Sequence, residues 1–461
     1  MTELIKTISP IDGKILLERS LASAKEISIV LEKSAYAQQQ WQLTSIEERK
    51  QFCHCAIDEL LKMQSEIALE ITQQMGRPIR YTPGEIKGLE ERGRVMIELA
   101  ETELADISIE QSEQSYRSIK RQPVGVVLVI APWNYPYLTA VNTIIPAIMA
   151  GNTVILKHSA QTPLCAERFV QAFKQAGVPE GVIQYLHLSH QSTAELIHCD
   201  EIAFVAFTGS VAGGREIEKA SVGRFIGVGL ELGGKDPAFV RADADILNAV
   251  ENLVDGAFFN SGQSCCGIER IYVHQNVYDD FLESFVDLTK QYQLGNPLEE
   301  ETTLGPLVNA KSAEFVRQQI NQAVKLGATA CINPQIFSAD KLGSPYMAPQ
   351  VLTNVNHQMS VMTEESFGPV VGIMKVSDDQ QAIHLMNNSQ YGLTASLWTQ
   401  DIEQAKMMGC QIQTGTVFMN RCDYLDPALP WTGVKNTGRG MTLSALGYQQ
   451  LPQAKSYNFR R

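Results

Sequence analysis

The sequence lacks any apolar run near the ~20 residues that a membrane-spanning helix requires. Its longest apolar stretch, Val124 to Ala131, instead indicates a buried strand. Met1 to Ser9 have neither the cationic start nor the apolar core of an export signal, so we expect none. A net charge of -13 argues against nucleic acid or anionic membrane as the main partner.

A regular cysteine framework is also absent. The nine cysteines are odd in number and irregularly spaced, which favours free thiols and a reducing, cytoplasmic location. The pair in Cys53-His54-Cys55 has no second Cys/His pair at a suitable distance, and an apolar helical stripe continues past it. We therefore expect no metal site.

The length and pattern of the chain predict an α/β fold with more than one domain. At 461 residues the chain exceeds a single core. Residues 18–107 carry mostly helical spacing, and from Val124 short β-branched runs alternate with helical stretches, a pattern typical of parallel sheets. A second block of this kind begins near Glu231.

Two segments fit neither block. Glu110 to Pro123 and Tyr448 to Arg461 look extended, with exposed edges that proteins usually cover by association. We therefore expect a small β oligomerisation arm and a homodimer or homotetramer. The expected division is a first domain of 1–107 and 124–230, a second of 231–432, and an arm of 108–123 with 433–461.

The segment Phe258 to Cys266 is the most informative for chemistry. It places two thiols in a polar turn, where we expect Gly262 to let the backbone approach a ligand closely. Upstream, Glu231 precedes Leu232-Gly233-Gly234-Lys235. A thiol nucleophile and a carboxylate base on Gly-rich turns indicate covalent catalysis followed by activation of water.

Other polar residues follow predicted strands, where open α/β sheets bind ligands. Asn134 is the strong hydrogen-bond donor of a rigid loop after the first strand, and Lys157 ends the next. Gly209 and Ser210 open a helix whose N–H groups suit a pyrophosphate. Gly227 to Leu232 lacks the third glycine of the common dinucleotide fingerprint and carries no weight.

Taken together, the ordered motifs resemble those of the aldehyde dehydrogenase superfamily along nearly the whole chain. They are Pro-Trp-Asn-Tyr-Pro at 132–136, Lys157, Phe-Thr-Gly-Ser at 207–210, Glu-Leu-Gly-Gly-Lys at 231–235, Phe-Phe-Asn-x-Gly-Gln-x-Cys at 258–265, Glu-Glu-Ser-Phe-Gly-Pro at 364–369 and Gly-Val-Lys-x-x-Gly at 433–438. The resemblance implies a Rossmann-like cofactor domain, followed by a catalytic domain and an arm.

The resemblance also implies the catalytic roles. Cys265 matches the nucleophile, whereas Cys266 matches a neighbouring, non-catalytic thiol. The side chain of Asn134 and the backbone N–H of Cys265 would hold the oxyanion formed from an aldehyde. Glu231 matches the general base that releases a carboxylic acid.

For an NAD(P) cofactor, the resemblance assigns a residue to each part of the dinucleotide. Lys157 would reach the adenosine ribose, Ser210 the pyrophosphate and Glu365 the nicotinamide ribose; Gly209, Leu232, Phe367 and Trp133 complete the set. Many NAD-preferring members carry a ribose-binding Glu where this chain has Ala160. Without that acid, Lys157, helped by His158, is free to attract a 2′-phosphate, so we expect NADP to be accepted.

The sequence says less about the identity of the aldehyde substrate. Succinate semialdehyde members use an Arg where this chain has Asn142, which disfavours that specificity. Tyr135, Tyr137, Leu138 and Phe259 suggest an apolar tunnel, and the loop Arg421–Tyr424 is either part of its mouth or a solvated loop with an Arg–Asp pair. The alternatives are a coenzyme A-acylating relative, a non-catalytic homologue with a binding or structural role and, more remotely, a cysteine hydrolase.

Overall fold

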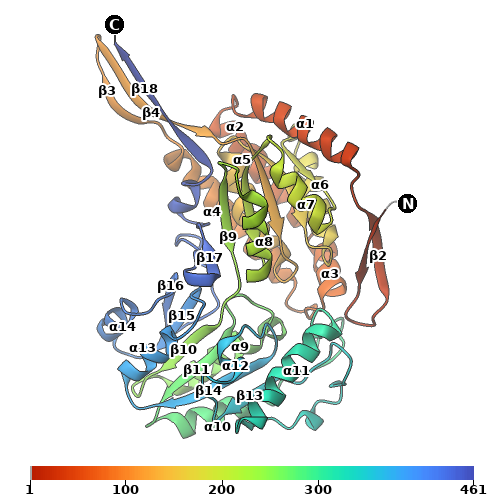
Figure 1. Ribbon diagram of the computed structural model, residues 1–461, viewed down its shortest axis with the longest axis vertical. Helices are drawn as coiled ribbons and strands as arrows, with labels where there is room; N and C mark the ends of the chain where they lie inside the picture. The colour runs from red at the N-terminus through yellow and green to blue at the C-terminus, as the bar shows by residue number, and fades with distance from the viewer. Residues whose placement is uncertain (1–2, 461) are drawn as a thin grey trace.

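The structure, a computed structural model, describes residues 3–460; Met1, Thr2 and Arg461, at the ends of the expected first domain and arm, lie outside the described residues. Two α/β domains lie one above the other, and a narrow β arm projects from the upper one (Figure 1). The expected fold class is confirmed.

The first domain is built on a six-stranded sheet with the order β17-β9-β8-β5-β6-β7. All its neighbouring strands are parallel except β17, which is antiparallel to β9. The strands are β5 (Val126–Ala131), β6 (Thr153–His158), β7 (Ile183–Tyr185), β8 (Ile202–Thr208), β9 (Gly227–Glu231) and β17 (Gly438–Arg439). The helices are α1 (Ala24–Trp41), α2 (Ile46–Lys62), α3 (Gln64–Met75), α4 (Pro83–Glu103), α5 (Pro136–Met149), α6 (Pro163–Gln175), α7 (His190–His198) and α8 (Val211–Ser221).

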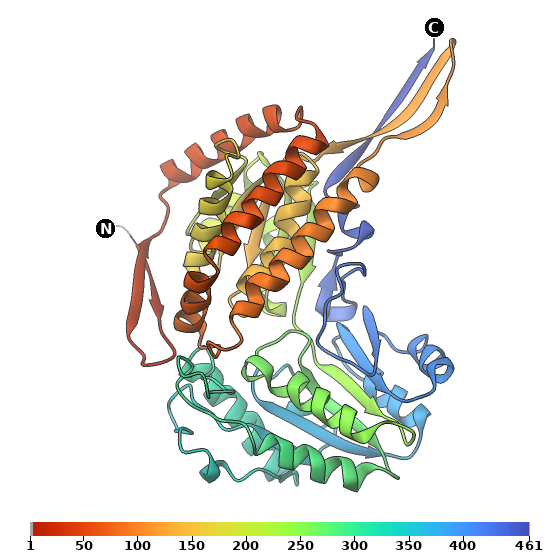
Figure 2. The same cartoon turned by 180° about the vertical axis from the view of Figure 1, so that it is seen from behind.

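Successive side chains of a strand point to opposite faces of a sheet. Because both faces of this sheet carry apolar side chains, helices cover both. In β5, Val127 and Val129 pack into the core formed with α2, α4, α5 and α6. Val126 and Leu128 face the opposite core, formed with α1, α7 and α8. Figure 2 shows the α2 and α4 side from behind.

The second domain contains a seven-stranded sheet with the order β12-β13-β14-β11-β10-β15-β16. Its strands are β10 (Asp236–Val240), β11 (Ile268–His274), β12 (Thr329–Ala330), β13 (Gln350–Thr353), β14 (Val370–Val376), β15 (Thr394–Trp398) and β16 (Thr416–Met419). The helices are α9 (Ile246–Phe258), α10 (Tyr278–Thr289), α11 (Ala310–Lys325), α12 (Ser360–Thr363), α13 (Asp379–Asn387) and α14 (Ile402–Gly409).

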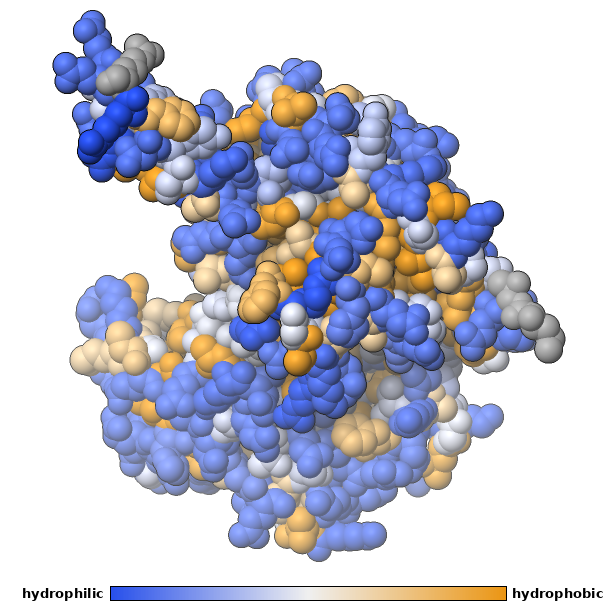
Figure 3. Space-filling model, turned by 45° about the horizontal axis from the view of Figure 1, so that its top comes forward, coloured by the Kyte–Doolittle hydropathy of each residue, from blue (hydrophilic) through white to orange (hydrophobic). Residues whose placement is uncertain are grey.

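The arm is a three-stranded antiparallel sheet of β3 (Ile107–Gln111), β4 (Ser115–Pro123) and β18 (Pro452–Arg460). It stands clear of both domains and carries mostly hydrophilic side chains on the face seen in Figure 3. The C-terminal part of the arm is shorter than the expected 433–461. The strand β17 joins the first sheet instead, and Leu443, Tyr448 and Leu451 pack into the first core.

A hairpin of β1 (Leu4–Ile8) and β2 (Ile15–Ser20) precedes α1 and was not predicted. β1 alternates exposed and buried positions, but Leu4 and Ile8 are exposed and Thr7 is buried, so the sequence shows no clear apolar alternation. In the described part of the chain, no helix combines the length and apolarity needed to cross a membrane.

Candidate active site

A turn of unusual backbone geometry presents Cys265. Asn260 (φ 52°), Ser261 (φ 58°) and Gly262 (φ 70°) follow α9 in left-handed conformations. A Cβ on Gly262 would lie 2.3 Å from the carbonyl oxygen of Gly368. Gly262 therefore accommodates the protein's own backbone. The expected close approach of a ligand stays a prediction.

The two adjacent thiols have different surroundings. Cys266 is buried, and its Sγ lies 2.8 Å from Oδ1 of Asp423. The Cys265 thiol, burial and the Asp423 carboxylate together raise the pKa of Cys266 well above its ordinary value. Cys265 is partly exposed and lines two cavities. Geometry therefore favours Cys265 as the reactive thiol.

Asn134 lies beside this turn, directly after β5. Its Nδ2 donates to the carbonyl oxygen of Gln263 at 3.2 Å. Among the described residues, no protein acceptor takes the backbone N–H of Cys265. The sequence-predicted pair of donors thus comes from neighbouring loops.

A buried ion pair that the sequence did not predict positions Asn134. Arg77 pairs with Glu85 at 2.6 Å and also donates to the carbonyl oxygen of Asn134. The other oxygen of Glu85 accepts from the backbone N–H groups of Tyr137 (2.9 Å) and Leu138 (3.0 Å), in the first turn of α5. Only the folded chain brings these residues together, so no local motif marks them.

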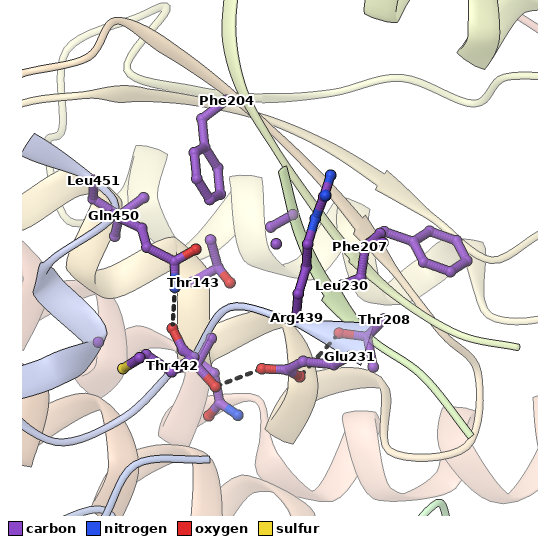
Figure 4. A pocket seen from close by; sticks show the side chains of 15 residues that line it. Thr143, Phe204, Phe207, Thr208, Leu230, Glu231, Arg439, Thr442, Gln450 and Leu451 are labelled. Atoms are coloured by element: carbon purple, nitrogen blue, oxygen red, sulfur yellow. Dashed lines mark hydrogen bonds between the residues drawn. The ribbon is translucent and has the colours of Figure 1, made fainter. Parts of the chain in front are cut away.

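Glu231 ends β9 and is held by two threonines (Figure 4). Its carboxylate accepts from Oγ1 of Thr208 at 3.2 Å and from Oγ1 of Thr442 at 2.5 Å. Burial raises the pKa of Glu231, and the two hydroxyl donors oppose that shift. A carboxylate with a raised pKa is suited to accept a proton near neutral pH.

Two cavities meet at Cys265, Glu231 and Leu232, which line both. The first, here called the front cavity, lies between α4 and α5; Tyr135, Leu138 and Phe259 line it as expected. Tyr137 does not, because its buried ring packs against Phe169 at 5.2 Å between centroids.

The loop Arg421–Tyr424 borders the front cavity, as the first sequence interpretation expected, whereas the second interpretation, a solvated Arg–Asp pair, is wrong. The Arg421 guanidinium stacks 3.8 Å from the centroid of the Tyr424 ring. Asp423 turns inward to the thiol of Cys266, so the expected solvated Arg–Asp pair is not present among the described ion pairs. Asp423 and Tyr424 both line the cavity.

The second, here called the cofactor cavity, collects most of the predicted cofactor residues. They are Trp133, Gly209, Ser210, Leu232, Glu365 and Phe367. The Trp133 and Phe367 rings meet edge to face, 5.6 Å apart. Glu365 accepts from the backbone N–H of Gly234 at 3.0 Å. Burial, with the nearby Glu269 carboxylate, raises the pKa of Glu365 to about 8.

Three details of the cofactor prediction change. The N–H of Gly209 is taken by the carbonyl of Glu231 at 3.0 Å, so it is not free for a phosphate. His158 is buried and bonded to the carbonyl of Pro136, and burial lowers its pKa to about 4, so it is neutral and cannot assist with a 2′-phosphate. Lys157 is buried at the end of β6 and is not among the residues that line the cofactor cavity.

A second buried network, also missed from sequence, fixes the loop that carries Glu365 and Phe367. The Glu269 carboxylate accepts from the N–H groups of Ser366 (2.8 Å) and Phe367 (3.0 Å), and it is ion-paired with Lys235.

The two thiols of Cys53-His54-Cys55 do not converge, because Cys53 is buried and Cys55 is exposed. The expectation that this segment binds no metal stays a prediction.

The cofactor cavity fits a dinucleotide on its own geometry. The N-terminus of α8, capped by the Ser210 hydroxyl on Gly213 (3.1 Å), faces it with helix N–H groups suited to an anion. A Cβ on Gly233 would lie 2.2 Å from Oε2 of Glu365, so this position must stay without a side chain. Aromatic rings and a carboxylate at the other end suit a nicotinamide riboside.

These features combine an accessible thiol with a neighbouring cavity that suits a dinucleotide, and comparison with known proteins identifies the family. The model of the aldehyde dehydrogenase family matches residues 1–457. An aldehyde dehydrogenase of Paenarthrobacter nicotinovorans is 35% identical over 98% of this chain and 99% of its own. The succinate semialdehyde dehydrogenase [NAD(P)+] Sad of Escherichia coli (strain K12) is 31% identical, covering 96% and 95%.

A solved structure agrees. Succinic semialdehyde dehydrogenase of Streptococcus pyogenes, in complex with NADP+, superposes with a TM-score of 0.94 at 28% identity, over 99% of this chain and 100% of that one. The chain belongs to the aldehyde dehydrogenase family. It is an NAD(P)-dependent enzyme that oxidises aldehydes, as the sequence predicted.

Proposed function

We propose that Cys265 is the nucleophile of this oxidation and that Glu231 and Asn134 are its catalytic partners. The observation that carries the proposal is the meeting of the two cavities at Cys265 and Glu231. The Cys265 thiolate attacks the aldehyde carbon to form a thiohemiacetal. The Asn134 amide and the Cys265 backbone N–H then stabilise its oxyanion.

Ser210, Glu365 and Phe367 would hold NAD(P), which would supply the acceptor for a hydride from the thiohemiacetal carbon. Cys265 would then carry a thioester. Glu231 takes a proton from water, and the resulting hydroxide attacks the thioester carbon. The C–S bond breaks, which releases a carboxylic acid and regenerates the thiol.

Hydrolysis is favoured over transfer of the acyl group to coenzyme A because a partly buried carboxylate with a raised pKa is present at Glu231. Products formed with and without coenzyme A test the choice. We expect the free acid in both reactions, and an acyl-CoA product at the same rate would overturn the hydrolytic reading. Absence of NAD(P)H formation across an aldehyde panel would favour a non-catalytic role instead.

We also propose that NADP is accepted. Support comes from the exposed Ala160, which places no acid near the end of β6 to repel a 2′-phosphate, and from the NADP+ complex of the Streptococcus pyogenes relative. Lys157 is the remaining cation at this strand end. Its burial lowers its pKa, and a bound 2′-phosphate would favour its charged form. The ratio of kcat/KM for NADP and NAD tests this, and a large preference for NAD would contradict it.

The remaining assignments concern assembly and location. The domain containing β5 would bind the cofactor, the domain containing β10 would carry the thiol, and the arm would join subunits into a homodimer or homotetramer. Exposed Ile107, Ile109 and Phe459 on the arm support association. The free state of all nine cysteines, each within the described residues, supports a reducing, cytoplasmic location.

A further inference from the structure

The front cavity contains an arginine that forms no ion pair, although the carboxylates of Glu85 and Glu231 act on it through space. Of the described residues that line it, two are arginines, Arg77 and Arg92. Arg77 is paired with Glu85. Arg92 makes no ion pair with any residue in the range 3–460, and its one hydrogen bond runs from Nη1 to the carbonyl oxygen of Leu138 at 3.0 Å.

Close packing of α4 on its neighbours holds Arg92 in this position. A Cβ on Gly88, one turn before Arg92, would lie 2.7 Å from Cδ2 of Leu138 on α5. A Cβ on Gly93 would lie 2.7 Å from Cδ1 of Ile57 on α2. The two glycines therefore let α4 approach both helices. Burial lowers the pKa of Arg92, but a guanidinium stays charged in proteins.

The carboxylates of the same cavity already have other partners. Asp423 accepts from Cys266 and Ser264. The hydroxyl of Tyr424 donates to Glu91 at 3.4 Å. Glu231 is held by its two threonines. Asp255 is the exception, since it is exposed on the cavity wall and forms no ion pair with Arg92.

Asn142, on α5, lines the same cavity and is 2% exposed. Its Oδ1 is buried and has no hydrogen-bond partner in the described structure. Rotation of the amide by half a turn would present Nδ2 in its place. A buried polar group without a partner is costly, so this position also suits a polar ligand.

We propose that Arg92 binds an anionic group at the far end of the aldehyde, so that the enzyme selects ω-carboxylated aldehydes. This inference rests on the proposed function of Cys265. It departs from the sequence-based expectation, which considered only position 142 as a source of the cation. The guanidinium comes instead from α4, and its planar fork can donate two parallel hydrogen bonds to a carboxylate.

The test compares kcat/KM for ω-carboxylated aldehydes of four to six carbons with that for unbranched neutral aldehydes of equal length. The wild-type protein should prefer the carboxylated series by at least about tenfold. In Arg92→Gln that ratio should fall by about 10- to 100-fold, mainly through KM, and Arg92→Lys should retain part of it. Arg94→Gln is the matched control, because Arg94 lies on the same helix but is ion-paired with Asp58 and Glu90 outside the cavity.

An equal preference for both series in the wild-type protein would overturn the inference, as would an unchanged ratio in Arg92→Gln. Thermal melting of each variant shows whether it is folded. If Arg92→Gln unfolds, a wild-type ratio in folded Arg92→Lys would overturn the inference. A different result would show that the proposed function of Cys265 is wrong. In that case Cys265→Ala would oxidise both aldehyde series as fast as the wild-type protein.

Discussion

The Sγ of Cys266 lies 2.8 Å from Oδ1 of Asp423, whereas the adjacent Cys265 opens onto both cavities. The same backbone turn therefore holds one thiol in the protein interior and presents the other to ligands. Reactivity follows thiolate character and access, which separates the two residues.

We predict that one equivalent of iodoacetamide alkylates Cys265 first and abolishes activity in proportion. Cys266→Ala should keep kcat within a few-fold of the wild-type value, because the raised pKa and burial of Cys266 make it a poor nucleophile. Peptide mass spectrometry identifies the alkylated residue. Modification of Cys266 ahead of Cys265 would refute the distinction.

Loss of the Asn134 side chain should mainly lower kcat, whereas loss of the Arg77 side chain should also lower the free energy of unfolding. Asn134→Ala removes an oxyanion donor, so kcat should fall by about 10²–10³ while the protein stays folded. Arg77→Met leaves Glu85 as an uncompensated buried charge, which should lower the free energy of unfolding by about 3–5 kcal/mol and also impair kcat. Urea midpoints and kcat for both variants check the contrast. Equal stability loss in the two would show that Arg77 does not have the proposed role.

Thr442→Val should change the pH dependence of turnover. The hydroxyl of Thr442 donates to Glu231 at 2.5 Å and favours its charged form, so its loss should raise the pKa of Glu231 further. Since the base must be ionised, the acidic limb of the kcat profile should move to higher pH. Thr208→Val, which removes a longer bond of 3.2 Å, should shift the limb less. A uniform fall in kcat at every pH would instead indicate a structural effect.

Glu365 should make stability depend on pH. Its pKa is raised from 4.5 to about 8 in the folded protein, so between these values the folded state holds a proton that the unfolded state has lost. Stability from this group therefore falls as pH rises through that window and is constant above it. The urea midpoint of Glu365→Gln relative to the wild-type protein should thus be higher at pH 8.5 than at pH 5. A difference that does not change with pH would contradict the shift.

Local motifs were sufficient to predict the alternation of strands and helices and the residues at strand ends. β5, β6 and β8 coincide with short runs rich in β-branched residues, and the Ser45 side chain caps the N-terminus of α2. Such features depend on neighbours in the chain. The hairpin β1–β2 lacked an apolar alternation in its sequence that would have marked it.

The contacts that orient the site could not be predicted because they join distant positions. Thr442 and Glu231 are 211 residues apart, and Arg77 and Asn134 are 57 apart. Threonine and arginine are common residues, and only packing shows which copy faces the site. For the same reason the sequence placed His158 beside a phosphate, whereas the fold buries it against Pro136.

The most direct measurement follows the reaction of Glu231→Gln with an aldehyde and NAD(P) on the millisecond scale. If Cys265 carries a thioester that Glu231 resolves, the variant should release one NAD(P)H per subunit in a burst and then slow sharply. Intact-mass and peptide analysis should find the acyl group on Cys265. Continued turnover at the wild-type rate, or a burst with no acyl group on Cys265, would contradict the mechanism.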